Sequence, residues 1–443
     1  MRVIVLTCAY YAAVLYGLFN PQFGLLFLFH IIIFRPENLA WGNAAFGRLH
    51  LITTLFVLAG YFLRIQKSKT DESYNHQKNN LVIFFLLIAW LIIVSLFAKA
   101  SVQSSLDQTW EIVKIFVFCF LFSRLIRTEH ELNRYLWVVV PSLGVLSFWG
   151  ILQHMEGNTR LDDLWPGGSV GLSAQLALMT PMAVGKAFDS KLSLSKKLVF
   201  LSCAFSMALC TFASESRGGF LGLTAGLAVF LAVSRHRVRL SIITAVAIFL
   251  IVPLISTAEY ERLKSIFVPA QDRDVSADSR PVLWTIEFRI WQDYPIAGVG
   301  LNNFSDIKEQ YFGKMDDIVK TDEMNSLIFG IRRMPHGTYT GMLAETGLIG
   351  FGLFLSLLLY NVFCRVSRQA SISNNSLYMQ LRGAQAGLLG FAIAAIFGDL
   401  QYIEMFYVQI FFVGIVVDRL RISATSSYFQ PSTLINCAWV TAR

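Results

Sequence analysis

The hydrophobic positions of the chain form long blocks that short polar connections separate. A helix needs about 20 apolar residues to cross a bilayer, and many of the blocks approach that length. The candidate spans are residues 3–19, 22–34, 49–65, 81–98, 110–126, 134–153, 170–187, 197–213, 218–234, 239–257, 338–364, 383–399 and 403–419. This pattern predicts an all-α polytopic membrane protein with about 12–13 transmembrane helices. Asn20-Pro21 leaves open whether the first two blocks are two helices or one kinked helix.

Composition and charge support the same class. Of the 443 residues, 55% are hydrophobic and 15% are charged, whereas soluble domains carry about 25% charged residues. The net charge of +8 comes from Lys and Arg in short connections beside the spans, where they set topology, so we expect no nucleic-acid partner. The six cysteines are scattered without a CxxC pair or a histidine at ligand spacing, so no disulfide framework, metal site or cofactor is predicted.

The distribution of charge also predicts the orientation and the domains. Alternate connections are basic and are expected to face the cytoplasm. The connection at 258–337 is about 80 residues long and faces outward, and loops of that length are usually functional. Within it, apolar residues recur at helical spacing from Arg280 to Gln292. The predicted organisation is a first transmembrane bundle of about 10 helices (1–257), a large periplasmic loop with short helices (258–337), C-terminal transmembrane helices (338–422) and a weakly ordered tail (423–443).

Two outward stretches combine a guanidinium with small or turn-forming residues. Arg217 and two glycines open a span, where free backbone amides favour an anion, although an interfacial arginine can equally extend its charged end to water. Arg280 precedes Pro281, a residue favoured in the first helical turn, so we expect the helix to begin there and its dipole to attract anions beside Arg280. An arginine in a polar loop is more often simply solvated.

A third outward stretch introduces a group that can exchange protons. His336 precedes the span at 338–364, and an imidazole can take up a proton near neutral pH. Glu345 follows within that span, where a carboxylate is costly without a partner. The alternative interpretation is that both residues are structural.

Taken in order, these stretches resemble the O-antigen ligase and polymerase superfamily of bacterial envelope glycan assembly. The matching segments are Ser216-Arg217-Gly218, Arg280 to Trp284, Pro295-Ile296-Ala297-Gly298-Val299-Gly300, His336 to Tyr339, and Glu345-Thr346-Gly347-Leu348-Ile349-Gly350. Residues 34–42 are similar to an O-glycosylation ligase subgroup associated with exosortase systems. Two positions depart from the pattern. Gly337 stands where the family has Asn, and Arg160 lacks the paired Asn that follow it in the subgroup.

The resemblance implies a metal-independent, inverting glycosyltransferase of the GT-C type in the bacterial inner membrane. Its donor would be a glycan on a polyprenyl diphosphate, and its acceptor would be a hydroxyl on a lipid, a polysaccharide or a protein at the periplasmic face. His336 is the expected general base and Arg280 the second catalytic residue. The expected substrate-binding residues are Arg217, Arg160, Trp284, Tyr339 and Glu345.

Two other functions remain open. A polymerase of the same family would use the same donor and differ only in its acceptor. A multispanning transporter belongs to another class, because charges inside spans can also mark a permeation path. Against the transporter, the sequence shows no inverted repeat and few charges within the spans.

Overall fold

The computed structural model describes residues 2–36, 49–64, 75–157, 161, 168–251, 275–312 and 337–428. These residues form helices and no strands, which confirms the all-α prediction. The helices are α1 (Arg2–Phe19), α2 (Pro21–Phe34), α4 (Leu49–Arg64), α5 (Asn75–Leu96), α6 (Val102–Leu125), α7 (Glu129–Met155), α8 (Gly168–Ala187), α9 (Leu194–Ala213), α10 (Arg217–Val233), α11 (Arg237–Ile251), α13 (Val275–Asp293), α14 (Phe304–Phe312), α16 (Thr338–Val362), α17 (Arg368–Ser373), α18 (Asn375–Ala394) and α19 (Glu404–Tyr428).

Four of the described helices, α5, α7, α9 and α16, are long and apolar enough to cross a membrane. Shorter apolar helices accompany them in α1, α2, α4 and α10. The chain is therefore an all-α polytopic membrane protein, and the number of crossings stays a prediction.

The first two hydrophobic blocks are separate helices. Asn20 ends α1 and caps α2, since its side-chain oxygen accepts the Phe23 amide at 3.2 Å, and Pro21 occupies the first turn of α2. A Cβ on Gly24 would lie 2.8 Å from the Cα of Gly17. The two helices can therefore fold back on each other, because both residues at their closest approach lack side chains.

The centre of the bundle is α8, which is buried along almost its whole length. It packs on α18, α9 and α10. Glycines permit this close approach, since a Cβ on Gly387 of α18 would lie 2.0 Å from the carbonyl oxygen of Leu178, and one on Gly219 of α10 would lie 2.2 Å from the Cβ of Ser173. Small residues that let backbones meet are a common packing device of membrane helices.

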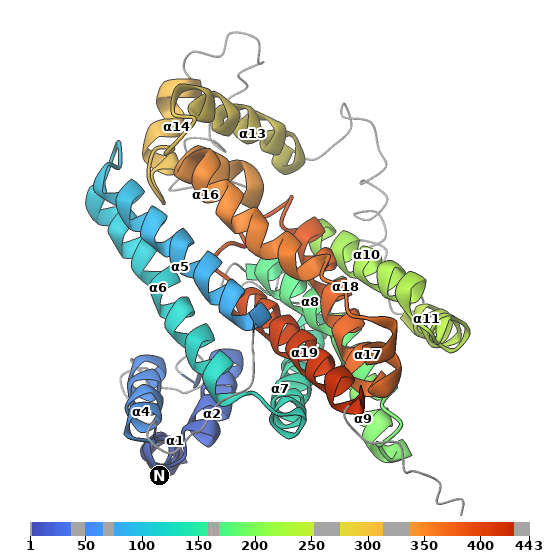
Figure 1. The fold of residues 1–443 in the computed structure, drawn as a ribbon. Helices are drawn as coiled ribbons and strands as arrows, with labels where there is room; N and C mark the ends of the chain where they lie inside the picture. Colours follow the sequence, from blue (N-terminus) through green and yellow to red (C-terminus); the bar gives the residue numbers. More distant parts are fainter. Residues whose placement is uncertain are drawn as a thin grey trace, which may run out of the picture.

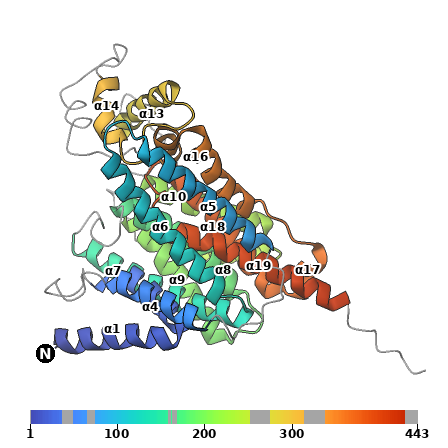
Figure 2. The ribbon, with the colours of Figure 1, turned by 60° about the vertical axis from the view of Figure 1, so that its left-hand side comes forward.

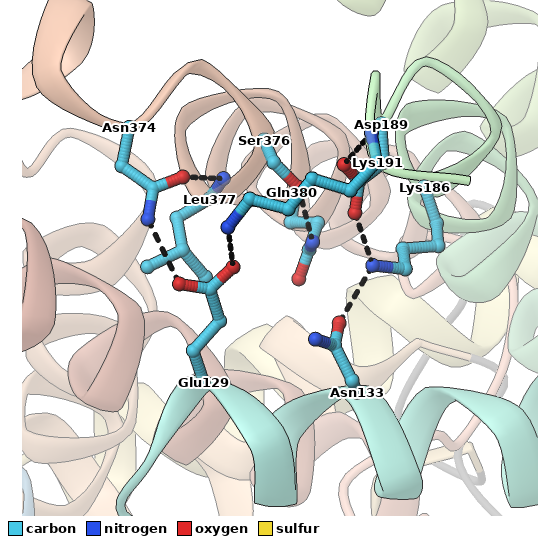
Figure 3. A network of polar contacts seen from close by, with 9 residues as sticks. All are labelled: Glu129, Asn133, Lys186, Asp189, Lys191, Asn374, Ser376, Leu377 and Gln380. Atoms are coloured by element: carbon cyan, nitrogen blue, oxygen red, sulfur yellow. Dashed lines mark hydrogen bonds and ion pairs between the residues drawn. The ribbon is translucent and has the colours of Figure 1, made fainter.

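A polar network secures the C-terminal end of α8 (Figure 3). The Nζ of Lys186 lies 2.7 Å from Oδ2 of Asp189 and 2.6 Å from Oδ1 of Asn133 on α7. Glu129 of α7 binds Lys191 at 3.1 Å and Asn374 at 3.0 Å, which ties the α8–α9 connection to the start of α18. Lys186 and Asp189 are buried, and the lysine lowers the pKa of Asp189 against the opposing effect of burial.

At the other end of α8, the helices α13 and α14 with the intervening residues 294–303 form an α13–α14 layer over the start of α16 (Figures 1 and 2). The layer has its own small core, which includes Val282, Ile286, Phe304 and Phe312, and this core closes on Ala344 of α16. The predicted helix at 280–292 is thus confirmed within α13. The helix begins at Val275, so Arg280 lies in its second turn and the expectation that Arg280 marks its N-terminus is wrong.

The layer is joined to a break in α16. Gly347 has φ 66° and ψ −172°, values outside the helical region, and the helix resumes after it. The backbone groups that the break leaves unpaired bond to the layer and to α5. These bonds are Val299 N to Ala344 O (3.1 Å), Gly300 N to Glu345 O (2.9 Å), Leu348 N to Pro295 O (2.9 Å) and Trp90 Nε1 to Thr346 O (2.9 Å). The Pro-x-x-Gly-x-Gly segment therefore completes the hydrogen bonding of the broken helix.

Candidate functional site

The starts of α10 and α16 and the Arg280–Trp284 segment of α13 meet at the connection between α18 and α19, which contains Phe397. The guanidinium of Arg280 lies over the Phe397 ring at 6.0 Å, and the ring of Trp284 lies 6.5 Å from it. A Cβ on Gly218, next to Arg217, would lie 3.0 Å from the Cβ of Phe397. The structure therefore places Arg280, Trp284 and the backbone beside Arg217 around Phe397.

Arg217 is the arginine that occupies a helix start. It is the first residue of α10, and the Ser216 side chain caps the helix by accepting the Gly219 amide at 3.2 Å. Because the N-terminus of a helix carries partial positive charge, its dipole and the guanidinium act on an anion in the same direction. The preceding Glu215 has a left-handed backbone (φ 51°), which turns the chain sharply from α9 into α10.

The start of α16 is fixed to the α18–α19 connection. The Thr338 amide donates to Ala395 O (2.9 Å), its hydroxyl donates to Gly398 O (2.6 Å), and the Leu400 amide donates back to that hydroxyl (2.9 Å). The Tyr339 hydroxyl donates to Ala392 O of α18 at 2.7 Å. Tyr339 thus has a structural contact, and its assignment to substrate binding stays a prediction.

Gly337 lies in a space too narrow for a side chain. A Cβ there would be 2.7 Å from Oγ1 of Thr340, 2.8 Å from Nε1 of Trp284 and 3.3 Å from the carbonyl oxygen of Ile396. A side chain at this position would therefore require Trp284 or Thr340 to move.

Glu345 joins α16 to the α13–α14 layer. Its side chain is 2% exposed, and its Oε1 accepts the Phe304 amide at 3.2 Å, with the amides of Asn302 and Asn303 also directed at the carboxyl group. This carboxyl group caps the start of α14. The interaction accounts for the residue structurally, and substrate binding by Glu345 stays a prediction.

Two acids that the sequence analysis did not select lie beside these motifs. Glu287 of α13 is fully buried and Asp399 lies in the α18–α19 connection. Burial and the neighbouring Glu345 raise the pKa of Glu287 to about 8, although the Thr340 hydroxyl opposes the shift. Burial, Glu287 and Glu345 raise the pKa of Asp399 well above its usual range, although the Gly337 amide donates to it.

A sequence signal existed for Glu287 alone. It lies seven residues after Arg280 and three residues after Trp284, which places all three on one helical face. Asp399 and Phe397 come from a connection distant in sequence, so no local spacing relates them to the motifs.

His336 and Arg160 lie outside the described residues. Gly337, the chain neighbour of His336, is described and donates its amide to Asp399. No group of three or more His, Cys, Asp or Glu side chains in the described part of the chain is arranged to hold a metal ion.

Two segments of the chain match known protein families. Residues 202–355 match the O-antigen ligase family, and residues 1–158 match a family of unknown function (DUF5935). A search of curated proteins found no match. The ligase match contains Arg217, Arg280, Trp284, His336, Tyr339 and Glu345, whereas Arg160 lies outside both matched ranges. Residues 202–355 therefore constitute an O-antigen ligase domain.

Proposed function

We propose that the protein transfers a glycan from a polyprenyl-diphosphate donor to an acceptor hydroxyl at the periplasmic face of the inner membrane. The observation that carries this proposal is the meeting of the Arg217 and Arg280 segments at Phe397, beside the start of α16. Membership of a family of envelope glycan ligases and polymerases supports a glycan-transferring enzyme.

The two arginines match the charge that develops in such a reaction. As the sugar leaves, its bond to the diphosphate oxygen breaks and negative charge grows on the leaving group. Guanidinium groups bind phosphate through paired, charge-assisted hydrogen bonds and stabilise that charge without a metal ion. At Arg217, the dipole of α10 attracts the anion in addition to the charge of the guanidinium. We assign both arginines to the donor diphosphate.

The acceptor side requires a base. As the acceptor hydroxyl attacks the anomeric carbon, its proton passes to His336 and the bond to the diphosphate breaks on the opposite side of the sugar. This displacement inverts the anomeric centre. Trp284 and Tyr339 would contact the substrates, and an apolar groove between helices would hold the polyprenyl chain.

The test is glycan transfer by the purified protein in nanodiscs with a polyprenyl-diphosphate glycan and a chelator. We expect wild type to transfer glycan and His336→Ala to fail while still binding donor, because the base acts after binding. His130→Ala, an exposed histidine in the first turn of α7, is the matched control. Transfer by His336→Ala at the wild-type rate would contradict the role of the base, and no transfer by wild type to any acceptor would contradict the proposed function.

Product length distinguishes the two members of the family that the sequence leaves open. A ligase attaches one preassembled glycan to a separate acceptor, so the product appears as a single addition. A polymerase extends the donor-linked glycan, so the product appears as a ladder.

A further inference from the structure

Glu287 is enclosed in protein. Its side chain has 0% exposure, and neither carboxyl oxygen has a hydrogen bond of normal geometry within the described residues. Water and hydrogen-bond donors are what stabilise an ionised carboxylate, so a buried group that lacks both favours the protonated acid. The pKa of Glu287, raised to about 8, agrees with that state.

The polar group beside Glu287 is the Thr340 hydroxyl, which also contacts Gly337. The Oγ1 of Thr340 donates to the carbonyl oxygen of Gly337 at 3.5 Å, and it lies close enough to Glu287 to oppose the shift of its pKa. A hydroxyl has one proton to donate and lone pairs that accept. Thr340 can therefore donate to Gly337 or to an ionised Glu287, but not fully to both.

The protonation state of Glu287 decides between these two arrangements. A protonated Glu287 takes no proton from Thr340 and leaves the hydroxyl proton for Gly337. An ionised Glu287 accepts that proton instead, and the Gly337 carbonyl loses its partner. The amide of Gly337 donates to Asp399, and its carbonyl oxygen accepts from Thr340. Both backbone groups of Gly337, the chain neighbour of His336, are therefore bound.

We propose that Glu287 is a positioning residue that acts as a neutral acid, holding Gly337 through the Thr340 hydroxyl. The group reacts with nothing itself. When it ionises, Thr340 turns away from Gly337, the residue that follows the proposed base in the sequence. The consequence for transfer rests on the proposed function, whereas the protonation of Glu287 and its coupling to Thr340 do not.

The charged groups that act on Glu287 come from two elements, α16 and the α18–α19 connection. Glu345 of α16 and Asp399 of the α18–α19 connection both act electrostatically with Glu287, and a negative charge on either favours its protonated form. On α13, Arg280 and Arg289 are not among the groups that shift its pKa. The same is true of Asp306, Lys308 and Glu309 on α14.

The first experiment needs no glycan. Infrared titration of the full-length protein detects the carbonyl band of a protonated carboxylic acid. We expect a band that disappears as the pH rises through about 8, is missing in Glu287→Gln, and changes frequency in Thr340→Val, which removes the hydroxyl but keeps the shape. Glu309→Gln, an exposed acid on α14, should leave the band unchanged. The same spectrum in Glu287→Gln as in wild type would overturn the inference.

The second experiment measures the transfer rate against pH. Wild type should lose activity by about tenfold per pH unit above the inflection, while Glu287→Gln, which stays neutral and can still donate, should keep near-neutral activity and lose the inflection. Thr340→Ser should retain the wild-type profile and Thr340→Val should lose it. An unchanged inflection in Glu287→Gln would overturn the positioning role. If wild type transfers no glycan, the proposed function fails and the infrared result still decides the state of Glu287.

Discussion

The indole nitrogen of Trp284 occupies the space that a side chain on residue 337 would need, since a Cβ on Gly337 would lie 2.8 Å from Nε1. The residue after His336 and the aromatic residue one turn beyond Arg280 are therefore matched to each other.

We expect Gly337→Ala to reduce glycan transfer by about tenfold or more, because the Cβ displaces Trp284 or Thr340 and overpacking costs about 1–3 kcal/mol. Gly352→Ala, in the helix that Gly337 precedes, is the control, since a Cβ there would meet nothing within 4 Å. Transfer rates of the two variants at equal amounts of folded protein make the comparison. Equal rates would show that glycan transfer does not depend on the close packing around Gly337.

Arg280→Ala should reduce transfer by about 100-fold or more, the usual effect of removing a group that stabilises developing charge. Arg280→Lys should recover little of it, because an ammonium cannot reproduce the paired bonds of a guanidinium. Arg289→Ala, which removes an arginine from the same helix, is the control and should stay near wild type. If Arg280→Lys were fully active, paired binding of phosphate would be excluded.

Gly347→Ala should destabilise the fold by about 3 kcal/mol or more, because it combines an unfavourable backbone conformation with a backbone clash. The φ at Gly347 is 66° and the new Cβ would lie 2.1 Å from the carbonyl oxygen of Ile296. Gly157→Ala separates the two effects, since its φ is 97° with no atom within 4 Å of the Cβ. That variant should lose about 1–2 kcal/mol. Thermal unfolding in detergent measures both.

Stability should fall as the pH rises from about 4.5 through about 8 because of Glu287. The pKa of this acid is raised from 4.5 to about 8 in the folded protein, so the folded state holds a proton that the unfolded chain has released over this range. The stabilisation is complete below the lower value and lost as the pH passes the upper one. The slope of Tm against pH should be smaller in Glu287→Gln than in wild type. Identical slopes would refute the assignment.

Lys186→Met should destabilise the protein by about 3–5 kcal/mol, because it leaves the buried carboxylate of Asp189 without its cation. The double variant Lys186→Met with Asp189→Asn removes both charges and should recover most of the loss. Chemical unfolding of the single and double variants measures the coupling. A double variant no more stable than the single one would show that the ion pair is not the source of the effect.

The sequence predicted the apolar helices well and their polar ends poorly. The block at 338–364 became α16, Thr338–Val362, because it is apolar over most of its length. The block at 81–98 became α5, which begins at Asn75. Its first turns carry buried polar side chains: Asn80 and Asn361 donate to each other at 3.1 and 2.9 Å. Hydropathy cannot identify a polar turn whose partner lies 281 residues away.

The site was predictable to the same extent. Motif order indicated that Arg217, Arg280 and the start of α16 act together, since each lies next to turn-forming residues at a helix boundary or in an outward loop. The residues that bring them together, Phe397 and Asp399, follow an apolar helix without any distinctive spacing. Their role depends on how the α18–α19 connection packs on Thr338, which only the tertiary structure determines.

Because residues 295–300 bond to the break in α16, the α13–α14 layer can assemble only after α16 has been synthesised. The amides of Val299 and Gly300 find their acceptors only on Ala344 and Glu345, which the ribosome adds more than 40 residues later. Until α16 emerges, the α13–α14 layer has no surface on which to close its core. The residues assigned to catalysis are therefore brought together late in synthesis, when most of the bundle is already inserted, and a chain truncated before α16 would have no assembled site.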